Sequence, residues 1–124
     1  MNEKIKLEDL KSALNRLKEG VSEVKNDLDQ DGVIQRFEFT FELVWKSIQE
    51  YARLSGVEVV SPKDSFRVAA ELKLIEDPEK WFTFLKDRNE STHLYDEAKA
   101  DEIFSHIPEF VKEVEGLISR MNTL

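Results

Sequence analysis

Several features that define common protein classes are missing from this chain of 124 residues. It contains no cysteine, which excludes a disulfide framework and a thiolate metal site. Four glycines and three prolines are too few turn residues for a β-sandwich. No apolar run approaches membrane-spanning length, and residues 1–6 lack the apolar core of a signal peptide. We therefore expect a cytoplasmic protein.

Positive charge is scarce as well. The chain has 18 lysines and arginines against 26 aspartates and glutamates, which gives a net charge of −8. Broad, non-specific binding to nucleic acid requires many cationic contacts to phosphate, so this charge balance argues against it. A small local anion site is still compatible with the composition. So is an acidic subunit that pairs with a more basic protein.

The residues that are present favour a helical domain. The chain is 40% hydrophobic and 35% charged, which is too apolar for a disordered chain. Its length is sufficient to bury a core. We expect one domain over residues 1–124.

Apolar residues repeat at spacings of three and four, the pattern of amphipathic helices. They predict a first helix from Leu7 to a point between residues 29 and 32, and a second over residues 33–54. Ser61-Pro62 and Asp77-Pro78 are start signals for a short third helix, ending near residue 74, and for a fourth. Asp96 is expected to cap the last helix. The sequence thus predicts an all-α fold, an up-and-down four-helix bundle with one short additional helix.

The second predicted helix is apolar on two sides. Phe37 and Phe41 belong to its main apolar face, whereas Phe39 and Leu43 fall on the opposite side at about 100° per residue. A helix with two apolar sides must be covered on both. A second copy of the chain would provide this cover in a homodimer, which is our first expectation. The alternative is a helix that lies centrally within one subunit.

The segment from Arg88 to Tyr95 carries the side chains best suited to chemistry. Arginine holds phosphate through a planar fork of donors, histidine transfers protons near neutral pH, and tyrosine offers a hydroxyl that can be modified. On one straight helix, Arg88 and His93 would diverge by roughly 140°. Their convergence requires a helix break near Thr92, or a two-fold axis that brings a second copy alongside.

A structural role is the ordinary explanation for such residues. A lone histidine at a helix end is more often structural than catalytic, and Arg88 beside Asp87 and Glu90 would form a surface ion pair worth at most about 1 kcal/mol. His106, the other histidine, is expected to be structural or exposed.

The sequence shows no pattern for a metal or a nucleotide loop. The two histidines do not have metal-ligand spacing. Glu38 and Glu42 lie on one helix face but lack the Glu-x-x-His partner of a di-metal bundle site. A glycine-rich phosphate loop is absent. We therefore expect no metal and no cofactor.

Arg88, His93 and Tyr95 match the R-x4-H-x-Y signature of the HEPN superfamily of small helical proteins. More closely, the chain resembles the nucleotidyltransferase substrate-binding family within it, whose members accompany a separate minimal nucleotidyltransferase. One departure is Lys73, where relatives tend to have glycine at a helix C-cap. The resemblance spans roughly residues 7–120, and its most specific segments are Arg36–Lys46, Ser61-Pro62-Lys63 with Arg67 and Ala70, Trp81, Asp87–Asn89 and His93–Glu97.

This resemblance implies a dimer and a toxin–antitoxin-like module. In it, the chain would be a metal-independent endoribonuclease that the nucleotidyltransferase silences by attaching AMP to Tyr95. Arg88 would orient the scissile phosphate, His93 would be the general acid or base, and Asn89 would position the reacting group. The alternative is a non-catalytic subunit that presents a nucleotide or other substrate to the nucleotidyltransferase. The intact signature favours the enzyme, whereas the acidic composition favours the binding subunit.

Overall fold

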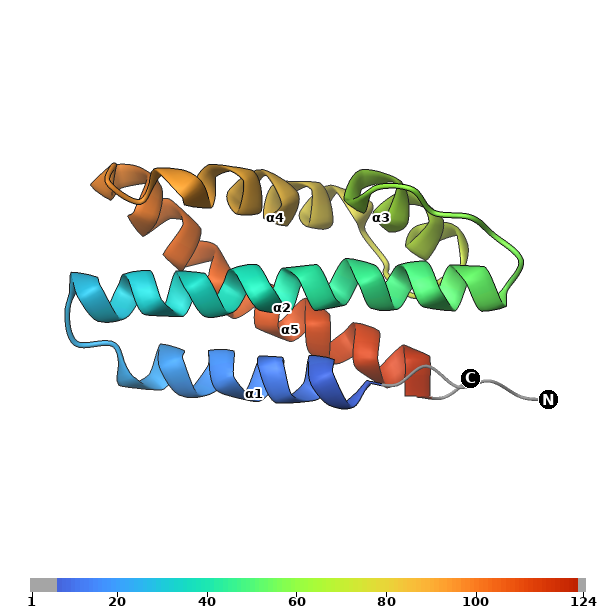
Figure 1. The fold of residues 1–124 in the computed structure, drawn as a ribbon, viewed down its shortest axis with the longest axis horizontal. Helices are drawn as coiled ribbons and strands as arrows, with labels where there is room; N and C mark the ends of the chain where they lie inside the picture. The colour runs from blue at the N-terminus through green and yellow to red at the C-terminus, as the bar shows by residue number, and fades with distance from the viewer. Residues whose placement is uncertain (1–6, 123–124) are drawn as a thin grey trace.

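The computed structural model describes residues 7–122. Four long helices run alternately up and down, and a short helix, α3, lies beside the start of α4 (Figure 1). The described part of the chain contains no β-strand. The predicted all-α bundle with one short additional helix is therefore confirmed. Its elements are α1 (Glu8–Glu23), α2 (Asp27–Leu54), α3 (Pro62–Glu71), α4 (Pro78–Glu90), the 3-10 turn η1 (Ser91–His93) and α5 (Glu97–Asn122).

A chain of aromatic rings forms the centre of the core. Phe37 and Phe41 from α2, Phe66 from α3, Trp81 from α4 and Phe110 from α5 are each at most 1% exposed. Successive rings have centroids 4.8–6.1 Å apart, mostly in tilted or edge-to-face arrangements. Such pairs contribute about 0.5–1.5 kcal/mol beyond the burial of their area. These contacts join α2, α3, α4 and α5 at the centre of the core.

α2 is the central helix of the bundle, because it contacts α1, α3, α4 and α5. Other helices of the same subunit therefore cover much of its apolar surface. This is the arrangement that the alternative to a homodimer, a helix central within one subunit, predicted. Leu43 and Trp45 are half-buried against the core, but Phe39 is still 37% exposed. The second apolar side of α2 is only partly covered by this chain.

The predicted end of the first helix is wrong. The apolar seam was expected to continue through Leu28, but α1 ends at Glu23 and Leu28 is 80% exposed in the first turn of α2. The side chain of Asn26 accepts a hydrogen bond from the backbone N–H of Asp29 at 2.8 Å. Asparagine is among the best helix N-caps, so this local cap starts α2 earlier than the apolar spacing suggested.

The start signals of the later helices are confirmed. Ser61 accepts a hydrogen bond from the N–H of Asp64 at 3.2 Å, and Asp77 accepts one from Glu79 at 2.9 Å. Asp96 likewise accepts from the N–H of Ala98 at 3.1 Å, immediately before α5. None of the described helices is long and apolar enough to cross a membrane.

Candidate functional site at the junction of α4 and α5

The signature residues lie where the chain passes from α4 to α5. Arg88 and Asn89 occupy the last turn of α4, which ends at Glu90. The following residues form η1, and the N–H of Asp96 donates to the carbonyl of His93 at 3.0 Å before α5 begins. The helix break near Thr92, one of the two alternatives that the sequence offered for convergence of the site, is therefore present.

Arg88 points inward, toward α2. Its Nη1 donates to Oε2 of Glu38 at 3.4 Å, and its Nε lies 3.8 Å from Oε1 of Glu42. The expected ion pair with Asp87 or Glu90 is wrong, because helix packing places two carboxylates of α2 closer. A guanidinium has five N–H donors, and no hydrogen bond joins Nη2 of Arg88 to any residue in the range 7–122.

Ser91 completes this contact and was missed from the sequence. It is 4% exposed, and its hydroxyl lies 2.5 Å from Oε2 of Glu38 and 2.7 Å from the carbonyl oxygen of Arg88. Sequence reasoning had considered Glu38 only as a metal ligand. The usable signal was the spacing of three between Arg88 and Ser91, which places the hydroxyl over the last turn of α4.

His93 and Tyr95 form a second group that faces solvent. Nδ1 of His93 lies 2.9 Å from the hydroxyl of Tyr95, and the two rings meet edge to face with centroids 5.6 Å apart. Tyr95 is 85% exposed. A hydroxyl partner at Nδ1 helps to decide which ring nitrogen carries the proton, and the exposure leaves the Tyr95 oxygen open to a reagent.

The two groups adjoin along the chain, and their polar contacts are separate. No hydrogen bond or ion pair among the described residues joins Arg88 to His93 or to Tyr95. Asn89 is exposed on α4, and its carbonyl accepts a 3.5 Å hydrogen bond from Thr92. One copy thus brings Arg88, Asn89, His93 and Tyr95 to one end of the bundle, where no hydrogen bond or ion pair among the described residues joins Arg88 to the other three.

His106 has a structural role, in line with the sequence expectation. Its Nδ1 lies 2.7 Å from Oδ2 of Asp87, a residue that is 3% exposed, and this contact ties α4 to α5 just before Arg88. Burial raises the pKa of the Asp87 carboxyl, and its hydrogen bond with His106 opposes that rise. No group of three or more potential metal-binding side chains occurs within residues 7–122.

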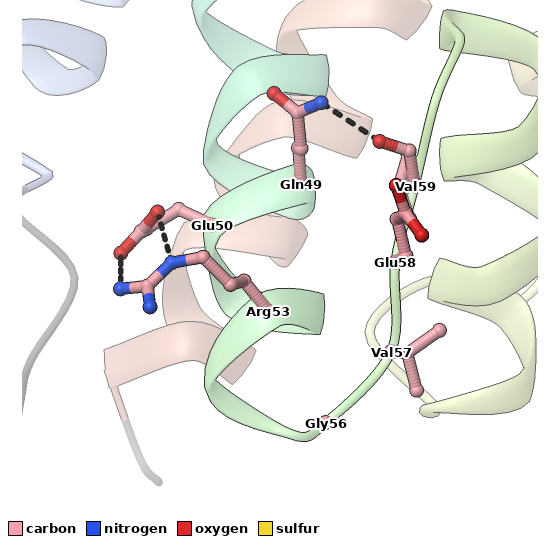
Figure 2. Close-up of a pocket in the computed structure, with 7 residues that line it drawn as sticks. All are labelled: Gln49, Glu50, Arg53, Gly56, Val57, Glu58 and Val59. Atoms are coloured by element: carbon pink, nitrogen blue, oxygen red, sulfur yellow. Dashed lines mark hydrogen bonds and ion pairs between the residues drawn. The ribbon is translucent and has the colours of Figure 1, made fainter.

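A separate pocket lies at the other end of α2. Figure 2 shows this cavity of about 450 Å³, which contains none of the predicted site residues. Gln49 donates to the carbonyl of Val59 at 2.8 Å across one wall, and Glu50 pairs with Arg53 on another. The pocket is therefore distant from the α4–α5 junction, and three of its polar lining residues, Gln49, Glu50 and Arg53, already have partners.

Comparison with known proteins defines the family. A family model described as "Nucleotidyltransferase substrate binding protein like" matches residues 5–123. The chain belongs to this family. The matched range includes the aromatic core, the α4–α5 junction and Arg88, Asn89, His93 and Tyr95.

Several proteins are similar to this chain in sequence and in fold. A Haemophilus influenzae protein named "Probable ribonuclease HepT" is 32% identical over 95 residues, covering 73% of this chain but 65% of the relative. The matched segment therefore spans just under two thirds of that protein. A crystal structure from Thermus thermophilus has a TM-score of 0.86 at 35% identity, covering 90% of this chain and 98% of the other. A second structure, from Haemophilus influenzae, is described as the fold of a substrate binding domain of a nucleotidyltransferase. It has a TM-score of 0.86 at 26% identity, covering 94% of this chain and 99% of the other.

Proposed function

We propose that this chain is the HEPN-type partner of a minimal nucleotidyltransferase in a toxin–antitoxin-like module. In this proposal it is a metal-independent endoribonuclease, and transfer of AMP to Tyr95 silences it. The observation that carries the proposal is the exposed His93–Tyr95 pair, which adjoins Arg88 at one helix junction. The name of one relative, a probable ribonuclease, and the description of another, a substrate binding domain of a nucleotidyltransferase, support the same reading.

The proposed cleavage uses three side chains at the junction. Arg88 binds the scissile phosphate, because its Nη2 edge makes no hydrogen bond within the described chain while Glu38 and Ser91 hold Nη1. His93 removes the proton from the attacking oxygen or returns one to the leaving oxygen. Asn89, exposed beside Arg88, hydrogen-bonds the reacting group. The phosphate would bridge Arg88 and His93, whose polar contacts are separate.

The proposed silencing reaction takes place on Tyr95. Its oxygen attacks the α-phosphorus of ATP, the bond from that phosphorus to the β-phosphate oxygen breaks, and diphosphate leaves. The hydroxyl proton passes to a base. The product places an adenylate with a negative charge next to His93, and the charge and bulk would repel an incoming RNA phosphate. An oxygen that is 85% exposed is accessible to a nucleotidyltransferase.

We also propose that the active unit is a homodimer. Phe39 is the exposed apolar residue of α2 nearest to Glu38 in sequence, and Glu38 binds Arg88. An interface on this side of α2 would therefore adjoin the Arg88 contact. In a two-fold assembly the same surface meets itself, so arginines and histidines of two copies would share one cleft.

One observation favours a second candidate, the non-catalytic binding subunit. Glu38 and Glu42 together place two negative charges against the single positive charge of Arg88. The whole chain has a net charge of −8. An RNA phosphate must approach against this field, whereas an uncharged substrate presented to the partner enzyme would not meet this repulsion.

The experiment is incubation of total RNA and transfer RNA with purified protein in EDTA. Parent protein is compared with Arg88→Ala and His93→Ala, and with Arg16→Ala as a matched control at an exposed arginine of α1. Cleavage by the parent and by Arg16→Ala, with none by the two site variants, supports the enzyme. No cleavage by parent protein whose intact mass shows unmodified Tyr95 would favour the binding subunit.

A further inference from the structure

We infer that a cationic surface on α3 and α4 binds the phosphate backbone of single-stranded RNA. This surface, the α3–α4 basic cluster, consists of Lys63, Arg67, Phe82 and Lys86. The three cations are exposed, and Phe82 is half-buried against the core. None of the catalytic or regulatory steps proposed above uses them. The inference rests on the proposed cleavage of RNA, because it supplies the path by which the substrate strand reaches the junction.

The aromatic ring of Phe82 holds two of the cations together. Nζ of Lys63 lies 5.9 Å from the ring centroid, and Cζ of Arg67 lies 6.0 Å from it. Both distances are within the range of a cation–π contact. Lys63 and Arg67 are four residues apart on α3 and therefore share a face. The ring therefore brings both cations to the same side of the α3–α4 pair.

No carboxylate neutralises these cations. Within the described residues, Lys63, Arg67 and Lys86 form no ion pair, although the chain has 26 acidic residues against 18 basic ones. Glu71 and Glu90 follow Arg67 and Lys86 by four residues, a spacing that permits helical ion pairs. Neither pair lies within 4 Å. Lys63 and Arg67 are like charges four residues apart and repel one another, and a bound polyanion would remove that repulsion.

The cluster leads along α4 to the candidate site. Phe82, Lys86 and Asn89 are spaced by four and three residues, so they share one face of this helix. At 1.5 Å per residue, the distance from Phe82 to Asn89 along the axis is about 10 Å. A strand that follows this face passes from the basic cluster to the last turn of α4. Alignment with the site favours RNA over an acidic protein surface as the occupant.

A single strand fits this arrangement better than a duplex. Proteins that bind single strands combine a cationic track for the backbone with aromatic side chains. Three cations on one helix pair form a short track, so contact with a few phosphates is compatible with a chain whose net charge is −8. The binding energy would come from local phosphate contacts and would fall with added salt.

The experiment measures binding of a short fluorescent single-stranded oligouridylate by anisotropy, in EDTA, over a series of salt concentrations. All proteins carry His93→Ala, so that the strand stays intact. The cluster variant is Lys63→Ala with Arg67→Ala. A control variant, Arg16→Ala with Lys112→Ala, has the same net charge and removes two exposed cations elsewhere. A third variant, Lys63→Arg with Arg67→Lys, keeps both charges, and circular dichroism checks that all remain folded.

The cluster variant is expected to bind about tenfold more weakly than the control. Its plot of log affinity against log salt should be flatter by about 1.4, because each phosphate contact to a single strand contributes about 0.7. The charge-retaining variant should bind as the parent does. Equal binding by the cluster and control variants would overturn the inference, as would absence of binding by every protein. Loss of a complex with the nucleotidyltransferase, with RNA binding intact, would identify the cluster as a protein interface and overturn it too.

This assay separates the inference from the proposed function, because it requires no cleavage. If the chain with intact His93 cleaves RNA in EDTA, but the cluster and control variants bind the oligouridylate equally well, the nuclease stands and the cluster does not serve it. If the cluster variant loses RNA binding but no protein cleaves RNA, the binding surface stands and the nuclease proposal fails.

Discussion

Arg88 is restrained by carboxylates, and the strength of that restraint decides whether it can bind a phosphate. Its Nη1 is 3.4 Å from Glu38 and its Nε is 3.8 Å from Glu42, longer than the 2.7–2.9 Å of a strong charge-assisted hydrogen bond. All three side chains are between 27% and 40% exposed. Ion pairs of this kind contribute at most about 1 kcal/mol. A phosphate with two oxygens for the guanidinium can therefore replace one carboxylate.

Tyr95 can be tested as the acceptor of AMP without disturbing the fold. Tyr95→Phe should change the free energy of unfolding by less than about 0.5 kcal/mol, because the residue is 85% exposed. Under the proposed function, intact mass after incubation with the nucleotidyltransferase and ATP should show an AMP increment on the parent and none on Tyr95→Phe. Tyr51→Phe, on α2, is the matched control and should still be modified. An increment on Tyr95→Phe would place the acceptor elsewhere.

The buried carboxyl group of Asp87 should make the free energy of unfolding depend on pH. Burial raises its pKa in the native chain, against the hydrogen bond with His106, and the charges of Glu102 and Glu90 raise it further. The native chain thus keeps this proton to a higher pH than the unfolded chain, in which the pKa is about 3.9. Ionisation of Asp87 lowers stability as the pH rises through the interval between these two values.

Asp87→Asn removes this titration. The free energy of unfolding of the variant minus that of the parent should rise from about pH 4 and level off above the native pKa of Asp87. Urea unfolding at a series of pH values measures the difference. A difference that falls as the pH rises would show that the hydrogen bond with His106 outweighs burial.

At the scale of elements, α3 is followed by a lysine, Lys73, in a backbone conformation that disfavours any residue with a side chain. Lys73 has φ +62°, in the left-handed region that glycine adopts most readily. Its N–H donates to the carbonyl of Ala70 at 3.1 Å, and the N–H of Leu74 donates to Ala69 at 2.8 Å. These bonds close the helix in the manner of a glycine C-cap. The sequence resemblance had identified Lys73 as the position where relatives tend to have glycine, and the backbone supplies the reason.

Lys73→Gly should therefore stabilise the protein by about 0.5–1 kcal/mol. Lys73→Ala removes the same charge but keeps a Cβ atom in the left-handed conformation, so it should give little or no gain. Urea denaturation of the two variants and the parent measures the difference. Equal stabilisation by alanine and glycine would attribute the effect to the lysine charge.

At the scale of the whole molecule, α2 divides its apolar surface between the core and the exterior. Ile34, Phe37, Phe41 and Val44 are at most 1% exposed, whereas Phe39 is 37% exposed on the same helix. Under the proposed homodimer, this residue lies in the interface. Net charges of −8 on two copies repel one another, so the dimer depends on apolar contacts and on screening by salt.

Phe39→Glu should lower the association constant of the dimer by about tenfold or more, because it places a charge at an apolar contact. Sedimentation velocity over a range of concentrations measures the constant. Val60→Glu, which alters a 74% exposed apolar residue in the connector before α3, should leave it unchanged. If the parent is a monomer at every concentration, or if both variants weaken the dimer equally, this interface is wrong.

The sequence by itself determined the fold class and most helix starts. Ser61, Asp77 and Asp96 cap their helices through hydrogen bonds to residues two or three positions away, so the information is local. The break near Thr92 was one of the two arrangements that the sequence offered for bringing Arg88 and His93 together, and the structure contains it. The apolar spacing gave the wrong end for the first helix, because it counted Leu28 as part of that helix. Leu28 instead lies in the first turn of α2, which Asn26 caps.

Only the tertiary structure decided what surrounds the candidate residues. Arg88 contacts Glu38, fifty positions earlier in the chain, instead of the neighbouring carboxylates that the sequence suggested. Lys63 and Arg67 meet the ring of Phe82 on another helix. Such partners depend on the angle and register at which helices pack, which the whole aromatic core sets. A local pattern therefore identifies the residues capable of chemistry, and packing determines the charges that each one faces.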